Sequence, residues 1–298
     1  MKIKYKDFYP IEIISFIYIA LTTLFIVVFW SDVKENAATA LLFARLAFVT
    51  IMVELFVWNR HSDKQTITVL RNVVPLAFVV HFYPETYFLN MVAFPDYLDP
   101  EIIRLDRWLF GCHPSTLFCE AAPWAWFNEL MNFAYFSYFF VIAGIVINLL
   151  WYNRAGAYRT AFILLCSFFI YYTLFIIFPT AGPQFYVFDH DTALPVLGPM
   201  RKILLFFHSI GEQPTGAVPS SHVGIMVIYM ILLWQHGRKL FWWILPLSVL
   251  LVLATVYIRA HYAVDVLLGF ISAPPIYLLS HWCWRKLSTK REALREVR

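Results

Sequence analysis

Long apolar runs alternate with short polar segments along the chain. A hydrocarbon core about 30 Å thick needs about 20 apolar residues for one helical crossing, so each run of that length predicts a transmembrane helix. The approximate limits of these runs are 13–30, 38–58, 73–91, 127–151, 160–178, 218–234, 240–258 and 262–284. The pattern therefore predicts an all-α fold, a polytopic membrane helical bundle with about eight transmembrane helices.

The composition agrees with this pattern. Hydrophobic residues make up 61% of the chain and charged residues 14%, against about 45–50% and about 25% in ordinary soluble domains. The first run is long and lacks a small-residue cleavage pattern after it, so we expect it to remain as a span and not to be removed as a signal peptide. These features exclude an ordinary soluble domain.

The basic residues predict the orientation. If the N-terminal end is cytoplasmic, alternation of the spans places most of the 23 Lys and Arg residues on the cytoplasmic side, as membrane proteins prefer. Both termini are then cytoplasmic and the longest loops face outward, and a bacterial inner membrane is the expected location. The net charge of +4 fits contact with anionic lipid head groups and carries no nucleic-acid signature.

Three parts are expected along the chain. Residues 1–66 carry two additional transmembrane helices, residues 67–286 a six-helix core, and residues 287–298 a basic cytoplasmic tail. Two long outer loops, about 93–126 and 179–217, are the expected place of function, since binding residues concentrate on loops held by a rigid scaffold. Within these loops, residues 101–110 and 199–210 are predicted to be short helices.

The four cysteines do not define a disulfide framework. Cys166 and Cys283 lie within apolar runs and are predicted core residues. Cys112 and Cys119 both fall in the first outer loop, where an oxidising compartment permits a bond. Their spacing leaves that pairing open.

The segment from Gly216 to His222 ends in Pro219-Ser220-Ser221-His222. Ser220 or Ser221 can cap a helix that starts here. The amides and dipole of such a helix end favour a phosphate group. The alternative is a plain helix start with His222 at the membrane interface.

A second polar pair, His261 and Asp265, lies at the outer start of the last run. An i, i+4 spacing places two side chains on one helix face, where they can hydrogen-bond. An Asp in a membrane helix is costly and usually has a partner and a function, and a carboxylate at one ring nitrogen determines which nitrogen attacks. With nine histidines one such pair can arise by chance, but His222 on the same outer side makes coincidence a poor explanation.

Three blocks of this sequence resemble the type 2 phosphatidic acid phosphatase superfamily. They are residues 178–183, which read Phe-Pro-Thr-Ala-Gly-Pro, residues 219–222, and residues 261–265 with Leu267-Leu268-Gly269 after them. The resemblance covers the chain from the third span onward and implies a six-helix phosphatidic acid phosphatase-like core.

The resemblance also implies roles for the polar residues. His261 attacks phosphorus to form a phosphohistidine, Asp265 orients it, and His222 protonates the leaving oxygen. No metal or other cofactor is needed, and the partners are membrane lipids. The expected substrate-binding residues are Pro179, Thr180, Gly182, Pro183, Gln184, Ser220, Ser221 and Arg259.

The chain departs from the phosphatase branch in its cations. That branch carries Lys and Arg in the first block and Arg six residues before the nucleophile, whereas this chain has Gln184 after Pro183 and Thr255 at the later position. Fewer cations suit a monoanionic phosphodiester better than a dianionic monoester. The chain thus resembles the inositol phosphorylceramide synthase and sphingomyelin synthase-like branch, whose members are transferases.

This branch implies transfer of a head group such as inositol phosphate from a phospholipid to a lipid alcohol such as ceramide. One alternative is a lipid phosphate phosphatase acting on phosphatidate or undecaprenyl diphosphate, in which Arg259, Arg201 and Lys202 restore positive charge. Another is a non-catalytic lipid-binding or transport protein, which the intact set of two histidines and Asp265 argues against.

Other polar residues in the apolar runs are assigned no chemistry. His81 and Glu85 repeat the i, i+4 spacing, but Pro84 is expected to interrupt the helix there, which favours a structural role. Arg45 and Glu54 are too far apart to pair directly and are expected to meet other helices or to reach the interface.

Overall fold

The computed structural model describes residues 7–62, 65–140, 143–144, 147, 155–188 and 198–288. Every regular element in these ranges is a helix, which confirms the predicted all-α class. Six of the described helices are long and apolar enough to cross a membrane: α1 (Pro10–Val28), α2 (Ala38–His61), α3 (Gln65–Leu89), α8 (Ala155–Ile177), α12 (Arg238–Tyr257) and α13 (Ala263–Leu287). The chain is a polytopic membrane helical bundle.

The two other predicted spans differ from this set. The run 218–234 forms α11 (Ser221–His236), whose 16 residues span about 24 Å at 1.5 Å per residue. The run 127–151 begins as α6 (Ala125–Phe136), but most of its second half lies outside the described residues. Over the described residues, six predicted crossings meet the length criterion and α11 forms a shorter apolar helix.

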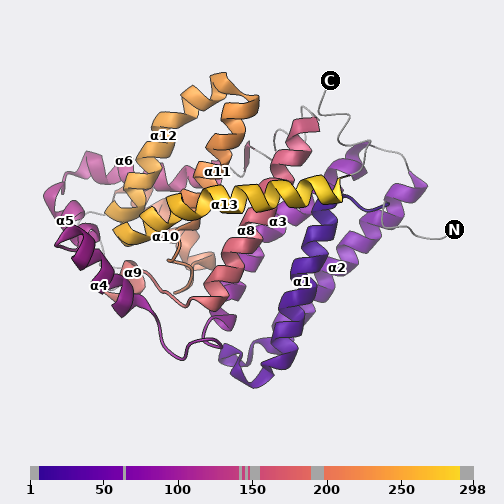
Figure 1. The fold of residues 1–298 in the computed structure, drawn as a ribbon, viewed down its shortest axis with the longest axis horizontal. Coiled ribbons are helices and arrows are strands. Elements are labelled where there is room, and N and C mark those ends of the chain that lie inside the picture. The colour runs from indigo at the N-terminus through magenta and orange to yellow at the C-terminus, as the bar shows by residue number, and fades with distance from the viewer. Residues whose placement is uncertain are drawn as a thin grey trace.

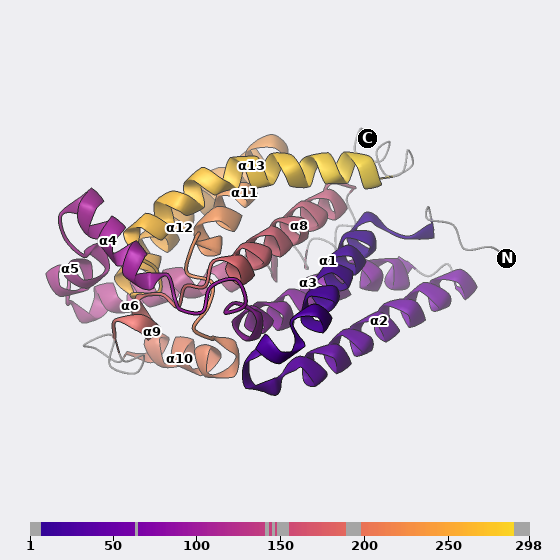
Figure 2. The same cartoon turned by 60° about the horizontal axis from the view of Figure 1, so that its bottom comes forward.

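The helices α8 and α11 form the centre of the bundle. α11 packs against α8, α12 and α13, and α8 also contacts α1 and α3. α1, α2 and α3 form a group at the right of Figure 1 and α12 lies at the left, while α13 runs across the bundle from α12 toward α1, as Figure 2 also shows. Residues on these contacting faces, among them Phe162, Tyr171 and Ile228, are almost completely buried.

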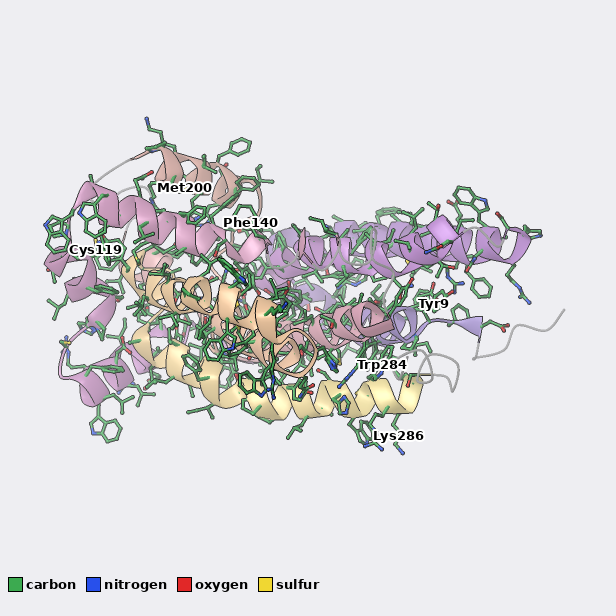
Figure 3. The ribbon with its side chains drawn as sticks, turned by 90° about the horizontal axis from the view of Figure 1, so that it is seen from above. Tyr9, Cys119, Phe140, Met200, Trp284 and Lys286 are labelled. Atoms are coloured by element: carbon green, nitrogen blue, oxygen red, sulfur yellow. The ribbon has the colours of Figure 1, made fainter. Side chains whose placement is uncertain are left out.

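Short helices gather at one end of the bundle (Figure 1). They are α4 (Asp99–Phe110), α5 (Pro114–Ala121), α6, α9 (Pro183–Tyr186) and α10 (Pro199–Gly211). α4 and α10 confirm the two short helices predicted in the long loops. Figure 3 shows Cys119 and Met200 toward this end and Tyr9 and Lys286 toward the other.

The connection between α1 and α2 contains two short 3₁₀ helices, η2 (Trp30–Asp32) and η3 (Lys34–Asn36).

The division of the chain at residues 66 and 286, and the orientation in the membrane, stay predictions. Residues 289–298 of the predicted tail lie outside the described part.

Buried ion pairs join the first three helices. Arg45 on α2 meets Glu85 on α3 at 2.7 Å, and His81 lies 3.1 Å from the same carboxylate. The predicted interruption at Pro84 is wrong, because α3 continues through Pro75 and Pro84 to Leu89. An isolated charge in hydrocarbon is costly, so the Arg45–Glu85 pair is a structural link between helices.

All four cysteines are free thiols. The pairing of Cys112 with Cys119, which their spacing left open, is not formed in the structure. Cys166 is buried, as predicted for a core residue, and Cys283 is partly exposed.

Candidate active site

The N-terminus of α11 is built by close packing around Ser220. Ser220 is the capping residue, and its Oγ accepts a bond from the Val223 amide at 3.4 Å. A Cβ at Gly269 on α13 would lie 2.8 Å from the Ser220 carbonyl oxygen, so glycine lets the two helices touch. Of the two predicted caps, Ser220 has this role and Ser221 is the first helical residue.

The two candidate histidines meet at this helix end. His222 Nδ1 lies 3.2 Å from His261 Nε2, and His261 Nδ1 lies 2.9 Å from the Ala217 carbonyl oxygen. Because a carbonyl only accepts, His261 carries its proton on Nδ1. Its Nε2 therefore presents a lone pair toward His222.

The relation between His261 and Asp265 differs from the expected hydrogen bond. α13 begins at Ala263, so His261 precedes the helix, and its Nδ1 is 3.5 Å from Asp265 Oδ2. That oxygen accepts from the Tyr262 amide at 2.9 Å. The Ala217 carbonyl orients the imidazole, and the fully buried Asp265 lies behind the ring.

The first block interlocks with the other two. Thr180 Oγ1 accepts a hydrogen bond from the Val218 backbone amide at 3.0 Å, and the Gln184 backbone amide donates one to the Arg259 carbonyl at 2.9 Å. Gly182 has φ +89°, and a Cβ there would lie 2.9 Å from the Ala260 carbonyl oxygen. Its neighbour Pro183 is the first residue of α9. The structure thus brings the three predicted blocks together.

Two aspartates on α4 hold this arrangement. The Asp99 carboxylate accepts from the amides of Ala181 and Gly182, both at 2.8 Å, and from the Tyr262 hydroxyl at 2.9 Å. Asp106 accepts from the Val264 amide at 2.8 Å, at the start of α13. Burial raises the pKa of the Asp99 carboxyl, and these hydrogen bonds oppose the rise.

Replacing Asp99 by Asn is expected to loosen the loop beneath His261. The amide keeps one acceptor oxygen where the carboxylate has two, and a lost hydrogen bond to a charged group costs about 1.5–3 kcal/mol. We expect a lower melting temperature and slower lipid turnover, measured on the purified protein. Exposed Asp96→Asn is the control, and equal behaviour of the two variants would contradict the anchoring role.

The three nearby cations, Arg259, Arg201 and Lys202, do not line the cavities beside the histidines. The Arg259 guanidinium stacks over Phe188 at 3.9 Å and lies 4.0 Å from the Glu120 carboxylate. Arg201 is buried on α10, and Lys202 is exposed.

An acidic group stands beside the histidines instead. Glu212 Oε1 accepts from Gln184 Nε2 at 2.7 Å, and Glu212 Oε2 contacts His208 Nδ1. This pair was not predicted from the sequence, although His208 and Glu212 have the same i, i+4 spacing as His261 and Asp265. Its position at the end of α10 brings it to the mouth of the site.

Two cavities adjoin at His222. The smaller has a volume of about 10 Å³ and is lined by both histidines with Gln184, Glu212 and other residues. The larger has a volume of about 330 Å³ and reaches His222 but not His261. Its walls are largely apolar and aromatic, with contributions from Val79, Tyr83, Tyr135, Tyr138, Phe168 and Phe207.

Burial lowers the pKa of His261 to about 4, although the Ala217 carbonyl and Glu212 act in the opposite direction. The ring is therefore neutral at pH 7, as a nucleophile requires. Because protonation removes the lone pair on Nε2, the attack should be lost as pH falls through about 4, and not through the usual 6.5.

The same shift makes stability depend on pH. The unfolded His261 binds a proton below about pH 6.5 and the folded one only below about 4, so the unfolded state binds more protons between these values. The free energy of unfolding should therefore fall as pH is lowered from 6.5 to 4. Single-turnover rates and melting temperatures from pH 3 to 7 test both effects, and loss of the single-turnover rate around pH 6.5 would contradict the first.

Residues 100–279 match the PAP2 superfamily. The match covers more than half of the chain and contains both histidines and Asp265, so the chain belongs to this superfamily. Its members are phosphatases and phosphotransferases, which supports chemistry of this type on lipid phosphates. The match begins after α3, which the sequence had assigned to the core.

Comparison with curated proteins and with solved structures finds no match. Over the described residues, no group of three or more His, Cys, Asp or Glu side chains could hold a metal ion.

Proposed function

We propose that this protein is an integral membrane lipid phosphotransferase. It moves a phospho-head group, of the inositol phosphate kind, from a phospholipid to a lipid alcohol such as ceramide. The reaction passes through a phosphohistidine on His261. The observation that carries this proposal is the lack of basic side chains around the histidine pair. Gln184 and Glu212 line the small cavity, whereas Arg259 and Arg201 do not.

In the first step, His261 Nε2 attacks the phosphorus of the donor. The bond between phosphorus and the lipid oxygen breaks, and His222 gives its proton to that oxygen, so that diacylglycerol leaves. Reacting atoms must approach to about 3–3.5 Å, so the phosphoryl group takes the place of the 3.2 Å contact between the two rings. The dipole of α11 favours the anion.

In the second step, the hydroxyl oxygen of the acceptor attacks the same phosphorus. The bond between phosphorus and Nε2 breaks, its electron pair returns to His261, and His222 takes the hydroxyl proton. His222 thus acts as acid and then as base. The cycle ends with both histidines in their starting states.

Phosphodiesters and phosphomonoesters differ in charge. A phosphomonoester is close to a dianion and needs cations in a buried site, whereas a phosphodiester carries one negative charge. The Glu212 carboxylate beside the site opposes a dianion further. A phosphatase acting on phosphatidate or undecaprenyl diphosphate is therefore the weaker candidate.

The test offers the purified protein labelled phosphatidylinositol, with and without ceramide, and separately labelled phosphatidate, with the products resolved by mass spectrometry. We expect inositol phosphorylceramide only when ceramide is present. Free phosphate from phosphatidate without a transfer product would overturn the proposal and establish the phosphatase.

A further inference from the structure

Glu212 lies in the wall shared by the two cavities beside the histidines. Its carboxylate accepts a hydrogen bond from the Gln184 side-chain nitrogen Nε2 and contacts the His208 ring nitrogen Nδ1. Both can donate hydrogen bonds, which suits an ionised carboxylate, a group that only accepts. The cavity wall therefore presents an acceptor with negative charge next to His222.

The larger cavity fits the apolar chain of a lipid alcohol. It reaches His222, which exchanges a proton with the alcohol oxygen in the proposed reaction, and does not reach His261, which holds the head group. Donor and acceptor alcohols use the same proton carrier. They therefore occupy this cavity in turn, first the leaving diacylglycerol and then the acceptor.

The two alcohols differ in the groups next to the reactive hydroxyl. A diacylglycerol presents ester carbonyls, which only accept hydrogen bonds. An N-acyl sphingoid base presents an amide N–H and a second hydroxyl, which donate. Two acceptors facing each other in a buried site leave their hydrogen bonds unmade, which is unfavourable, while a donor facing a carboxylate forms a strong hydrogen bond.

We infer that Glu212 selects the acceptor, favouring a lipid alcohol with a second hydrogen-bond donor beside its reactive hydroxyl over diacylglycerol. This inference rests on the proposed transferase function. It changes how the phosphohistidine partitions between two acceptors, because the sphingoid acceptor then attacks it faster than the diacylglycerol that has just left. His208 acts as a positioning residue that holds the carboxylate.

The test compares two acceptors in the wild-type protein and in Glu212→Gln, with labelled phosphatidylinositol as donor. We expect kcat/KM for ceramide to fall about tenfold or more in the variant, in line with the loss of one charge-assisted hydrogen bond, and kcat/KM for diacylglycerol to stay unchanged or rise. Glu101→Gln, which alters an exposed carboxylate on α4 that pairs with Arg104, is the matched control.

A second measurement does not depend on the folding of a variant. The acceptor for this measurement is a ceramide with its amide N-methylated and its second hydroxyl O-methylated. In the wild-type protein, its kcat/KM should be lower than that of ceramide by a similar factor. In Glu212→Gln, the kcat/KM of the methylated acceptor should fall little further. An equal loss for both acceptors in Glu212→Gln, or full activity with the methylated acceptor, would overturn the inference. Absence of any transfer product from the wild-type protein would overturn the proposed function itself.

Discussion

Replacement of His261 by Asn is expected to abolish lipid turnover and the covalent intermediate together. Asn is smaller than imidazole but keeps a hydrogen-bond donor for the Ala217 carbonyl, which lies 2.9 Å from Nδ1 in the native site. It has no nucleophilic nitrogen. Because the phosphohistidine cannot form without this atom, the loss should be at least 10³-fold, on the order found when nucleophiles are removed from other enzymes.

The measurement is turnover of the labelled donor, together with the burst of diacylglycerol in the first turnover. His61→Asn is the matched control, since His61 is exposed at the end of α2 and its Nδ1 also contacts a backbone carbonyl. The control should keep native turnover and burst. Unchanged activity in His261→Asn would contradict the assignment of His261 as the nucleophile.

Replacement of His222 by Gln is expected to slow the first step by about 10²- to 10⁴-fold with a natural lipid donor, the usual range for loss of a general acid. A lipid alkoxide is a poor leaving group without a proton. With an aryl ester of the same head-group phosphate the leaving oxygen departs unprotonated, so the variant should release the aryl alcohol at close to the native rate.

This comparison separates acid catalysis from structure. The His222 ring stacks at an angle against Tyr135 and Tyr138, with centroids 4.7 and 4.5 Å away, and a packing defect would slow both substrates alike. Equal losses with the lipid and the aryl ester would therefore contradict the assignment of His222 as the acid. Transfer to the acceptor should stay slow in either case, because His222 also takes the acceptor proton.

The helices could be predicted because the membrane imposes a length. α2, α12 and α13 begin within two residues of the predicted runs, since their limits coincide with changes in polarity. α3 begins at Gln65, eight residues before the run assigned to it. Polar residues such as Arg71 and Asn72 interrupt the apolar pattern in this first part of α3, so it was not predicted. Their burial depends on partners such as Glu12, which the sequence alone does not identify.

The site could be predicted in its chemistry but not in its supports. His222 and His261 were placed on the same outer end, and they are in contact. The role of the Ala217 carbonyl could not be foreseen, because any residue has one. Asp99 and Asp106 lie seven residues apart on a short helix, a spacing that also fits a solvated face. Only the packing of α4 against residues 181–182 and the start of α13 shows that they bind backbone amides.

The mass of the adduct on His261 tests the phosphohistidine most directly. The purified protein is mixed with phosphatidylinositol without acceptor, quenched in base during the first turnover, digested and analysed by mass spectrometry. We expect a peptide in which His261 carries inositol phosphate, and no adduct in His261→Asn. If phosphatidate leaves a bare phosphoryl group on His261 and phosphatidylinositol leaves no adduct, the transferase proposal is contradicted. An adduct on another residue would contradict the assignment of His261 as the nucleophile.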